Sequence, residues 1–162
     1  MNGSAENRAS GASEKPGRSD AVMSLATARR MLPLVRRIVG DLLNARRRLA
    51  QLLPEQTRLD RLRRTLAWPE RARRYQLREE VADQEQYLQD ALAELEVLGL
   101  ALLEPAEGRV GFPAAVNDRR AFFLWQAGEE TVRGWQFVGE FVSRPIPAAW
   151  LEAEPVTSSP KG

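Results

Sequence analysis

The chain of 162 residues contains no histidine and no cysteine. Without histidine there is no imidazole to act as a general base, and without cysteine there is no thiolate nucleophile and no disulfide. Zinc sites built from cysteine and histidine are excluded for the same reason. Most common hydrolytic and metal-binding arrangements are thus removed before any motif is considered, and we expect no cofactor.

Long hydrophobic segments are also missing. The longest apolar run, residues 97–103 with its glycine included, is far shorter than the ~20 residues that a membrane helix needs. The first twenty residues lack the apolar stretch of a signal peptide. We therefore expect a soluble, cytoplasmic protein with no membrane association.

Lysine is nearly absent, and charge is unevenly distributed along the chain. Lys15 and Lys161 are the only lysines among the 24 basic residues. Residues 21–78 carry fifteen arginines and four acids, whereas residues 79–107 carry nine acids and no base. Such blocks indicate either a nucleic-acid-binding arm or two elements that neutralise each other within one fold.

The periodicity of apolar residues predicts a helical hairpin over residues 23–98. Residues 1–22 and 151–162 are expected to be disordered tails. Ser24 is the expected N-cap of the first helix, with Thr27 at its third position, and Gly99 is expected to end the second helix. Apolar residues recur at alternating steps of three and four, as in a coiled coil. The first seam runs through Val35, Ile38, Leu42, Ala45, Leu49, Leu52, Gln56, Leu59, Arg63 and Leu66, and the second through Leu77, Val81, Gln84, Leu88, Ala91, Leu95 and Leu98.

The hairpin turn is predicted near residues 68–70. Pro69 disfavours helical geometry at Trp68 and suits the first position of a new helix. The arms are then residues 34–67 and 70–98. Pro54 is the alternative turn, whereas a continuous first arm requires kinks near Pro33 and Pro54.

A turn at this place sets the pairing across the seam. It brings Gln56 opposite Gln84, so that the two amides share one layer. It also allows the basic and acidic blocks to neutralise each other, through Arg58, Arg61 and Arg64 on the first arm and Asp83, Glu85 and Glu80 on the second. The alternative is a basic groove for RNA or DNA formed by Arg46, Arg47, Arg48, Arg71, Arg73 and Arg74.

After Gly99 the sequence changes to short extended runs, which predict a small antiparallel sheet over residues 99–150. The fold class is therefore α+β: a long antiparallel two-helix coiled-coil hairpin with a small antiparallel β cap at its open end. Eight of the eleven aromatic residues lie between residues 112 and 150, and we expect them to pack on the base of the hairpin. The predicted strands are residues 100–103, 109–116, 121–126 and 131–138.

Several of these segments resemble a bacterial family known as domain of unknown function 2203. Met23-Ser-Leu-Ala-Thr-Ala-Arg-Arg-Met-Leu-Pro33 is similar to the family's opening Phe-Thr-x-x-Glu-Ala-Asn-x-Leu-Leu-Pro. The other similar segments are Gly108-Arg-Val-Gly-Phe-Pro113, Phe123-Leu-Trp-Gln-Ala-Gly-Glu129, Gly134-Trp-Gln136, Gly139 and Arg144-Pro-Ile146. The resemblance implies no activity, because the family has none assigned. An aspartate, a cysteine and a histidine of the family pattern correspond here to Gly111, Leu124 and Gln136, so any polar site that they form in relatives is lost.

The chemistry left in the cap centres on Glu129 and Arg144, which match the family pattern. They are expected to form a buried ion pair that joins a turn to the last strand. The alternative is the charged end of a small-ligand pocket walled by Trp125 and Trp135. No catalytic motif, phosphate-binding loop or dinucleotide fingerprint is present.

The hairpin also carries large apolar residues outside its seams. The cap is expected to cover Leu34, Val39, Leu92 and Val97, and to leave Leu43, Leu53, Leu62 and Tyr87 as an interaction surface along the shaft. We therefore predict a non-catalytic protein-interaction module, most simply a homodimer. Two alternatives stay open: a nucleic-acid-binding module that uses the arginine-rich first arm, and a small-ligand site in the aromatic cap.

Overall fold

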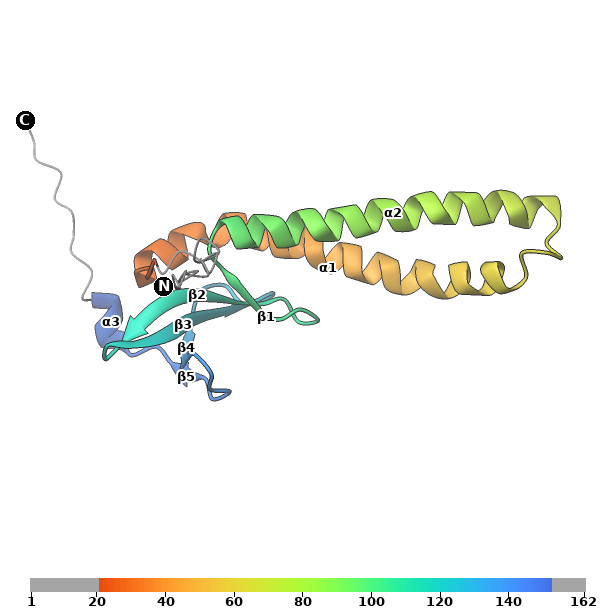
Figure 1. Ribbon diagram of the computed structural model, residues 1–162. Helices are drawn as coiled ribbons and strands as arrows, with labels where there is room; N and C mark the ends of the chain where they lie inside the picture. Colours follow the sequence, from red (N-terminus) through yellow and green to blue (C-terminus); the bar gives the residue numbers. More distant parts are fainter. Residues whose placement is uncertain (1–20, 153–162) are drawn as a thin grey trace, which may run out of the picture.

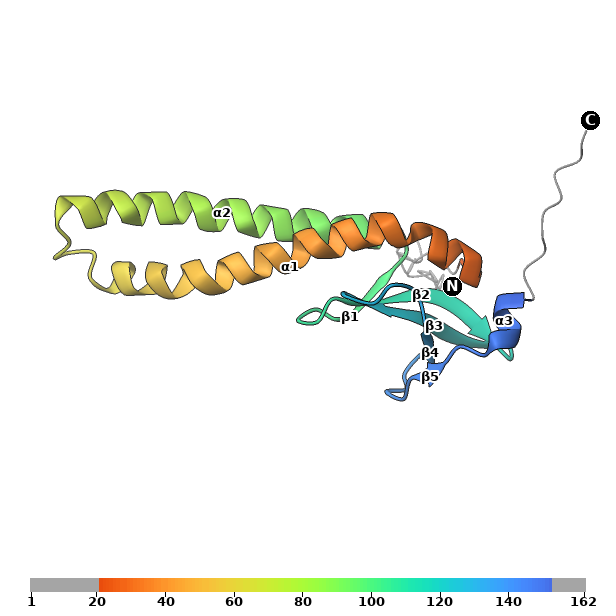
Figure 2. The ribbon, with the colours of Figure 1, turned by 180° about the vertical axis from the view of Figure 1, so that it is seen from behind.

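The computed structural model describes residues 21–152, and most of the two predicted tails lies outside this range. A long helical hairpin projects from a small sheet, so the predicted α+β class is confirmed (Figures 1 and 2). The elements are α1 (Leu25–Arg61), α2 (Trp68–Val97), β1 (Ala101–Glu104), β2 (Arg109–Val116), β3 (Arg119–Gln126), β4 (Gly134–Phe137), β5 (Arg144–Pro145) and α3 (Ala148–Glu152).

The first helix begins where the sequence predicts. Ser24 is the N-cap, and its hydroxyl oxygen accepts a hydrogen bond from the Thr27 backbone N–H at 3.1 Å. Pro33 and Pro54 both lie inside α1, which continues through them. Pro54 is therefore not the turn.

The turn lies earlier than predicted, in residues 62–67 rather than 68–70. Helix α1 ends at Arg61, and the Thr65 backbone N–H donates to the Leu62 carbonyl at 2.9 Å. Ala67 is the extended N-cap of α2, which places Trp68 at the first helical position and Pro69 at the second. The first N–H groups of a helix have no intrahelical partner, so proline is tolerated at either position. The sequence predicted Pro69 at the first position of the second helix, but Pro69 occupies the second position.

The two arms enclose two separate hydrophobic clusters. The distal cluster holds Leu49, Leu52, Leu59, Leu66, Leu77 and Val81. The larger cluster lies at the base, where the first half of α1 and the end of α2 pack on the sheet. All eight apolar residues of the first predicted seam are buried, which confirms the periodicity on which the hairpin was predicted.

The sheet is a five-stranded antiparallel meander in the order β1-β2-β3-β4-β5. Strand β2 has the predicted bounds, and it joins β3 through Asn117 and Asp118, whose φ angles are 51° and 61°. Two successive positive φ values define the type I′ turn that favours these residue types. The bounds of β4 are narrower than predicted, and the sequence does not predict β5 or α3.

One face of the sheet forms the core with the hairpin. Val110, Phe112, Phe123, Trp125 and Trp135 point to this face and are buried. Helix α3 packs on the end of the core, where the centroid of the Trp150 ring lies 5.4 Å from that of the Trp135 ring and 6.5 Å from that of the Phe123 ring. The predicted boundary at residue 150 is thus wrong by two residues, because Trp150 packs on the cap and the helix that carries it continues to Glu152.

Direct contacts fix the cap to α1. The Arg29 guanidinium donates to the Val132 carbonyl at 3.4 Å, and the Arg36 guanidinium donates to the Glu130 carbonyl. In the β1–β2 turn, Gly108 has a φ of 66°, and a Cβ there would lie 2.7 Å from a methyl group of Val39. The sheet therefore approaches α1 so closely that only glycine fits at this turn.

Candidate functional site

The four predicted cap residues do not form one site. Trp125, Glu129 and Arg144 line a shallow hollow of about 300 Å³ on the sheet. Trp135 does not line the hollow. It belongs to the core, where its ring makes an edge contact with the Phe137 ring, with the two ring centroids 4.9 Å apart. Trp125 also belongs to the core and is 2% exposed, so neither predicted tryptophan presents its ring as a wall of the hollow.

The predicted ion pair between Glu129 and Arg144 is wrong. The Arg144 guanidinium donates two hydrogen bonds of 3.2 Å to one carboxylate oxygen of Glu140 and lies over the ring of Trp135. The Glu129 residue is exposed, and its hydrogen bonds are made by the backbone: its N–H donates to the Gln126 carbonyl at 3.0 Å, and its carbonyl accepts from the Trp125 indole N–H at 2.9 Å. Glu140 lies between β4 and β5, only four residues before Arg144. This short separation along the chain brings its carboxylate next to the guanidinium.

The three positions that depart from the family pattern share the outer face of the sheet. Gly111 pairs with Leu124, and Gln136 pairs with Phe122, which lies two residues from Leu124 on the same strand. A Cβ on Gly111 would lie 2.8 Å from the Phe122 ring, so the ring takes up the space there. None of the three side chains can donate protons to a reaction or bind a metal as a carboxylate, thiolate or imidazole does. Within residues 21–152, no group of three or more acidic, histidine or cysteine residues is placed to hold a metal ion.

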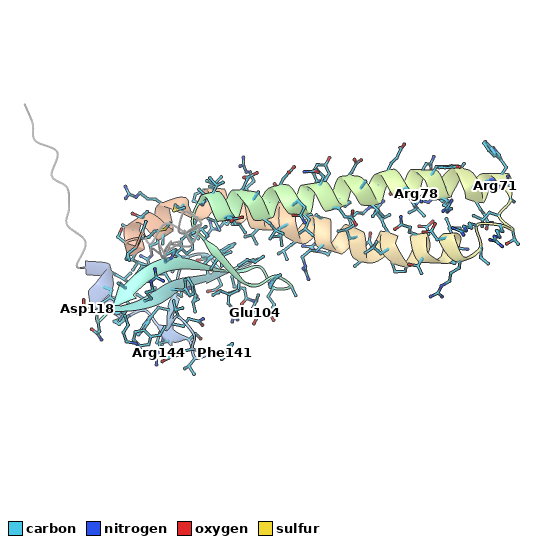
Figure 3. All side chains as sticks on the ribbon, viewed as in Figure 1. Arg71, Arg78, Glu104, Asp118, Phe141 and Arg144 are labelled. Carbon is cyan, nitrogen blue, oxygen red and sulfur yellow. The ribbon has the colours of Figure 1, made fainter. Side chains whose placement is uncertain are left out.

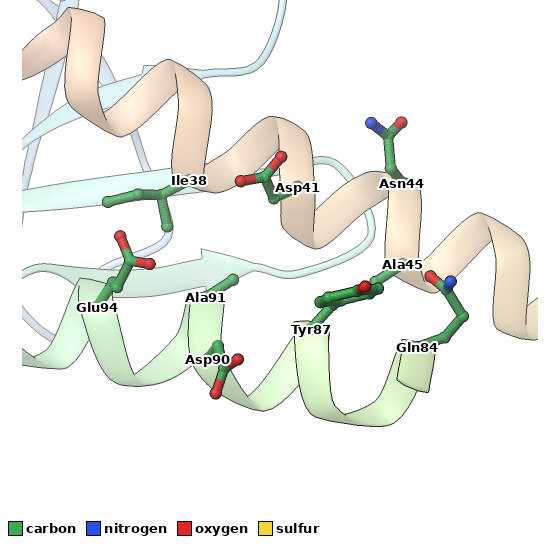
Figure 4. A pocket seen from close by; sticks show the side chains of 9 residues that line it. All are labelled: Ile38, Asp41, Asn44, Ala45, Gln84, Tyr87, Asp90, Ala91 and Glu94. Carbon is green, nitrogen blue, oxygen red and sulfur yellow. The ribbon is translucent and has the colours of Figure 1, made fainter. Parts of the chain in front are cut away.

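A second hollow, of about 370 Å³, lies between the two arms of the hairpin (Figure 4). It lies where the inner seam contains Ala45 and Ala91, whose small side chains leave space between the helices. Its lining also includes Tyr87, which is 57% exposed. Asp41, Asp90 and Glu94 give this hollow an acidic rim.

The predicted interaction residues lie on different sides of the hairpin. Leu43 is half-buried against the cap, whereas Tyr87 lines the hollow with Asp41. Asp41 and Leu43 are about 200° apart around the helix, so the hollow faces away from the cap. Leu53 and Leu62 are 41% and 46% exposed.

The covering of apolar residues by the cap also differs from the prediction. Val39 and Leu92 pack in the base, but Leu34 remains 39% exposed and Val97 86% exposed. The sheet lies along one side of the arms, and residues on the other sides stay open to solvent.

The ion pairs across the hairpin use other arginines than predicted, and of the three predicted acids they include Glu80. Arg73 binds Glu55 and Glu80, each at 3.0 Å, and Arg48 also binds Glu80. The hydrogen bond from Arg73 lowers the pKa of Glu55, and the two carboxylates raise the pKa of Arg73. These groups form a structural network that joins α1 to α2.

The earlier turn explains why the predicted pairs do not form. It places Glu80 opposite Arg48 and Arg73 opposite Glu55, several residues from the predicted register. Gln84 accordingly lines the hollow with Ala45. Gln56 lies about 16 Å beyond Ala45 along α1, so the predicted Gln56–Gln84 layer is wrong.

The predicted basic groove is divided by this network. Arg48, Arg73 and Arg74 are bound to carboxylates, the last to Asp60 at 2.6 Å. Of the other three, Arg46 and Arg47 lie on the shaft, and Arg71 lies at the distal end of the hairpin, which we call the tip and define as residues 58–79. There, eight arginines face three carboxylates. Figure 3 shows Arg71 at this end of the molecule and Arg78 further along α2.

Aromatic side chains at the tip were not among the predicted site residues. Trp68 is 73% exposed and Tyr75 is 63% exposed, in contrast to the buried tryptophans of the cap. Their spacing of seven residues was visible in the sequence.

The chain shows similarity to one family of conserved proteins. The model of the family described as "Uncharacterized conserved protein (DUF2203)" matches residues 22–142, and the chain belongs to this family. No curated protein matches the chain, and no solved structure matches it either. Among the described residues, no helix combines the length and apolarity that would let it cross a membrane.

Proposed function

We propose that this family member is a non-catalytic interaction module that associates with itself or with another protein through its hairpin. The cap holds the base of the hairpin, and the two arms project beyond it into solvent (Figure 1). The module presents a preformed helical surface and so binds with little loss of conformational freedom.

The observation that carries the proposal is the exposed Tyr87 beside the hollow on the side away from the cap. The seam residues Ile38, Ala45 and Ala91 form an apolar floor, and the Tyr87 ring stands next to it. A large aromatic group beside a depression is typical of the central anchor of an interface. A second copy of the chain is the simplest occupant, since in a two-fold dimer each copy offers both the ring and the depression.

The non-catalytic part of the proposal is supported by the location of the perturbed groups. Shifted pKa values often mark active sites. In the described part of the chain, Glu55 and Arg73 carry such shifts, and they hold each other across the hairpin rather than facing a cavity.

Sedimentation velocity of the full chain at about 10–50 μM tests the association. The unmodified protein should sediment as a dimer, and Tyr87→Glu should give a folded monomer because a carboxylate cannot enter the apolar depression. Val97→Glu is the matched control, since Val97 is an exposed apolar residue on the same helix. A monomeric unmodified protein that recovers no protein partner from cells contradicts the proposal.

A further inference from the structure

The beginning of α2 carries a stripe of alternating aromatic and basic side chains. Trp68, Arg71, Tyr75 and Arg78 follow each other at steps of three, four and three residues, which places them on one face of a helix. All four side chains are exposed. The stripe extends over about 15 Å. It lies on the tip, far from the cap (Figure 3).

The two rings lie apart from the aromatic packing of the cap. In residues 21–152, neither Trp68 nor Tyr75 packs on another ring or on a guanidinium group, whereas Trp135 packs on Phe137, Trp150 and Arg144. The hydrophobic cluster of the distal hairpin also forms without them. An exposed tryptophan leaves a large apolar surface in water, so the fold gains nothing from this placement.

The arginines around the stripe are also mostly free. Asp60 neutralises Arg74, and Glu55 and Glu80 neutralise Arg73. Arg71 uses its Nε–H to hold the Leu66 carbonyl in the loop. Within the described chain, Arg61, Arg63, Arg64 and Arg78 form no ion pair. The tip as a whole has a formal charge of +5.

We propose that the tip binds single-stranded nucleic acid. The free guanidinium groups would contact phosphates, and Trp68 and Tyr75 would stack on unpaired bases. This combination favours a single strand over two other polyanions. An acidic peptide satisfies the arginines but leaves the rings without a partner, and a duplex keeps its bases stacked within its own helix.

The tip is distinct from the association surface of the proposed function. The stripe residues do not line the hollow beside Tyr87. Nucleic-acid binding and self-association are therefore tested separately, and either can fail alone.

Binding is measured by fluorescence anisotropy, with the full chain and labelled oligo(U) or oligo(dT) of about 20 nucleotides. If four phosphates are contacted, affinity should fall roughly 50-fold between about 50 and 200 mM salt. Trp68→Ala should weaken binding roughly 5- to 150-fold, and Trp68→Phe should retain most of it. Tyr75→Ala should weaken binding in the same direction. A base stacked on the Trp68 ring should quench its fluorescence, and the other tryptophans lie in the cap, away from the bound strand. The quenching should therefore disappear in Trp68→Phe, while binding persists.

Matched variants separate the tip from a general charge effect. Arg63→Ala with Arg64→Ala should weaken binding, whereas Arg46→Ala with Arg47→Ala removes the same charge from the shaft and should have a much smaller effect. Phe141→Ala removes a fully exposed aromatic residue of the cap and should leave affinity unchanged.

Four results would overturn the proposal. The first is that no oligonucleotide binds at about 50 mM salt, and the second is that both arginine double variants lose the same affinity. The third is that a duplex binds as tightly as a single strand. The fourth is that poly-glutamate displaces the oligonucleotide and Trp68→Ala binds it as tightly as the unmodified protein. The last result would assign the tip to an acidic protein instead. A difference between the two labelled strands would identify RNA or DNA as the preferred ligand.

Discussion

The base of the molecule and the distal half of its hairpin are stabilised in different ways. At the base, two helices and a sheet from distant parts of the chain enclose one large cluster that includes Phe112, Trp125 and Val132, each at most 2% exposed. The distal hairpin has a single leucine-rich seam of six buried residues, with ion pairs along its edges. The same residue type, tryptophan, is core in one region and surface in the other.

The base is therefore a structural region, whereas the distal hairpin exposes side chains that can bind other molecules. The base buries Phe112, Phe123, Trp125 and Trp135 between the sheet and the elements that cover it, and substitutions of these residues should affect the whole fold. The distal hairpin buries only one stripe of each helix, so most of its side chains are free to contact something else. The tip lies on this distal part, whereas the hollow beside Tyr87 lies nearer the base, because Ile38 and Ala91 of its lining belong to the larger cluster.

The largest effect is expected from Trp125→Ala. Its ring is 2% exposed, and its indole N–H closes the turn at Glu129. The substitution should lower the free energy of unfolding by about 3–5 kcal/mol, as measured by urea denaturation. Trp68→Ala is the matched control and should change stability by less than about 0.5 kcal/mol. Similar losses from the two variants would remove the distinction between the regions.

A smaller and more local effect is expected from Leu52→Ala. Leu52 is 2% exposed in the distal cluster, and its truncation should cost about 2–4 kcal/mol. Hydrogen exchange should then accelerate in the distal parts of α1 and α2 and remain slow in the sheet, because the two clusters are joined through the half-buried Leu88 and share no buried residue. Uniform acceleration across the chain would show that the protein unfolds as one cooperative unit.

The sequence predicted best what depends on local pattern. The Ser24 cap, the seam from Val35 to Leu59 and the strand at residues 109–116 each rest on residues within a few positions of each other, and the structure confirms all three. The turn was misplaced because residues 62–67 contain no glycine, proline or asparagine. Leu66 also continues the seam beyond the end of the helix.

Pairings across space could not be predicted to the same extent. The misplaced turn shifted every predicted contact between the arms, including Gln56 with Gln84. In the cap, the choice of Glu140 over Glu129 as the partner of Arg144 depends on the path of the segment between β4 and β5. The stripe from Trp68 to Arg78 was readable as a spacing, but its exposure required the structure.

Substitution of two glycines tests the contact between the cap and α1. Both glycines have positive φ angles. Gly108 has a φ of 66° and lies against Val39 and Leu43 of α1, whereas Gly128 has a φ of 98° and has nothing within 4 Å of the position that a Cβ would take. Alanine at either position strains the backbone, but only Gly108→Ala also pushes the cap away from α1. Thermal denaturation should show Gly108→Ala to be less stable than Gly128→Ala by about 1–3 kcal/mol. Equal losses would mean that the contact adjusts without cost.

The smallest effect is expected at the edge of the distal hairpin, in the pH dependence that Glu55 contributes. The hydrogen bond from Arg73 lowers the pKa of Glu55 in the folded state from its ordinary value of 4.5. A carboxylate with a depressed folded-state pKa stabilises the fold at pH values above its unfolded pKa, and this contribution is lost as the pH falls through the folded-state value. Glu55→Gln should therefore lower the melting temperature slightly at neutral pH, and the difference from the unmodified protein should disappear in acid. Glu96→Gln, on an exposed part of α2 near the base, is the control and should leave the melting temperature at neutral pH close to that of the unmodified protein. The group is solvent-exposed, so added salt should reduce the difference at neutral pH. A difference that persists in acid would mean that the side chain stabilises the hairpin by packing rather than by its charge.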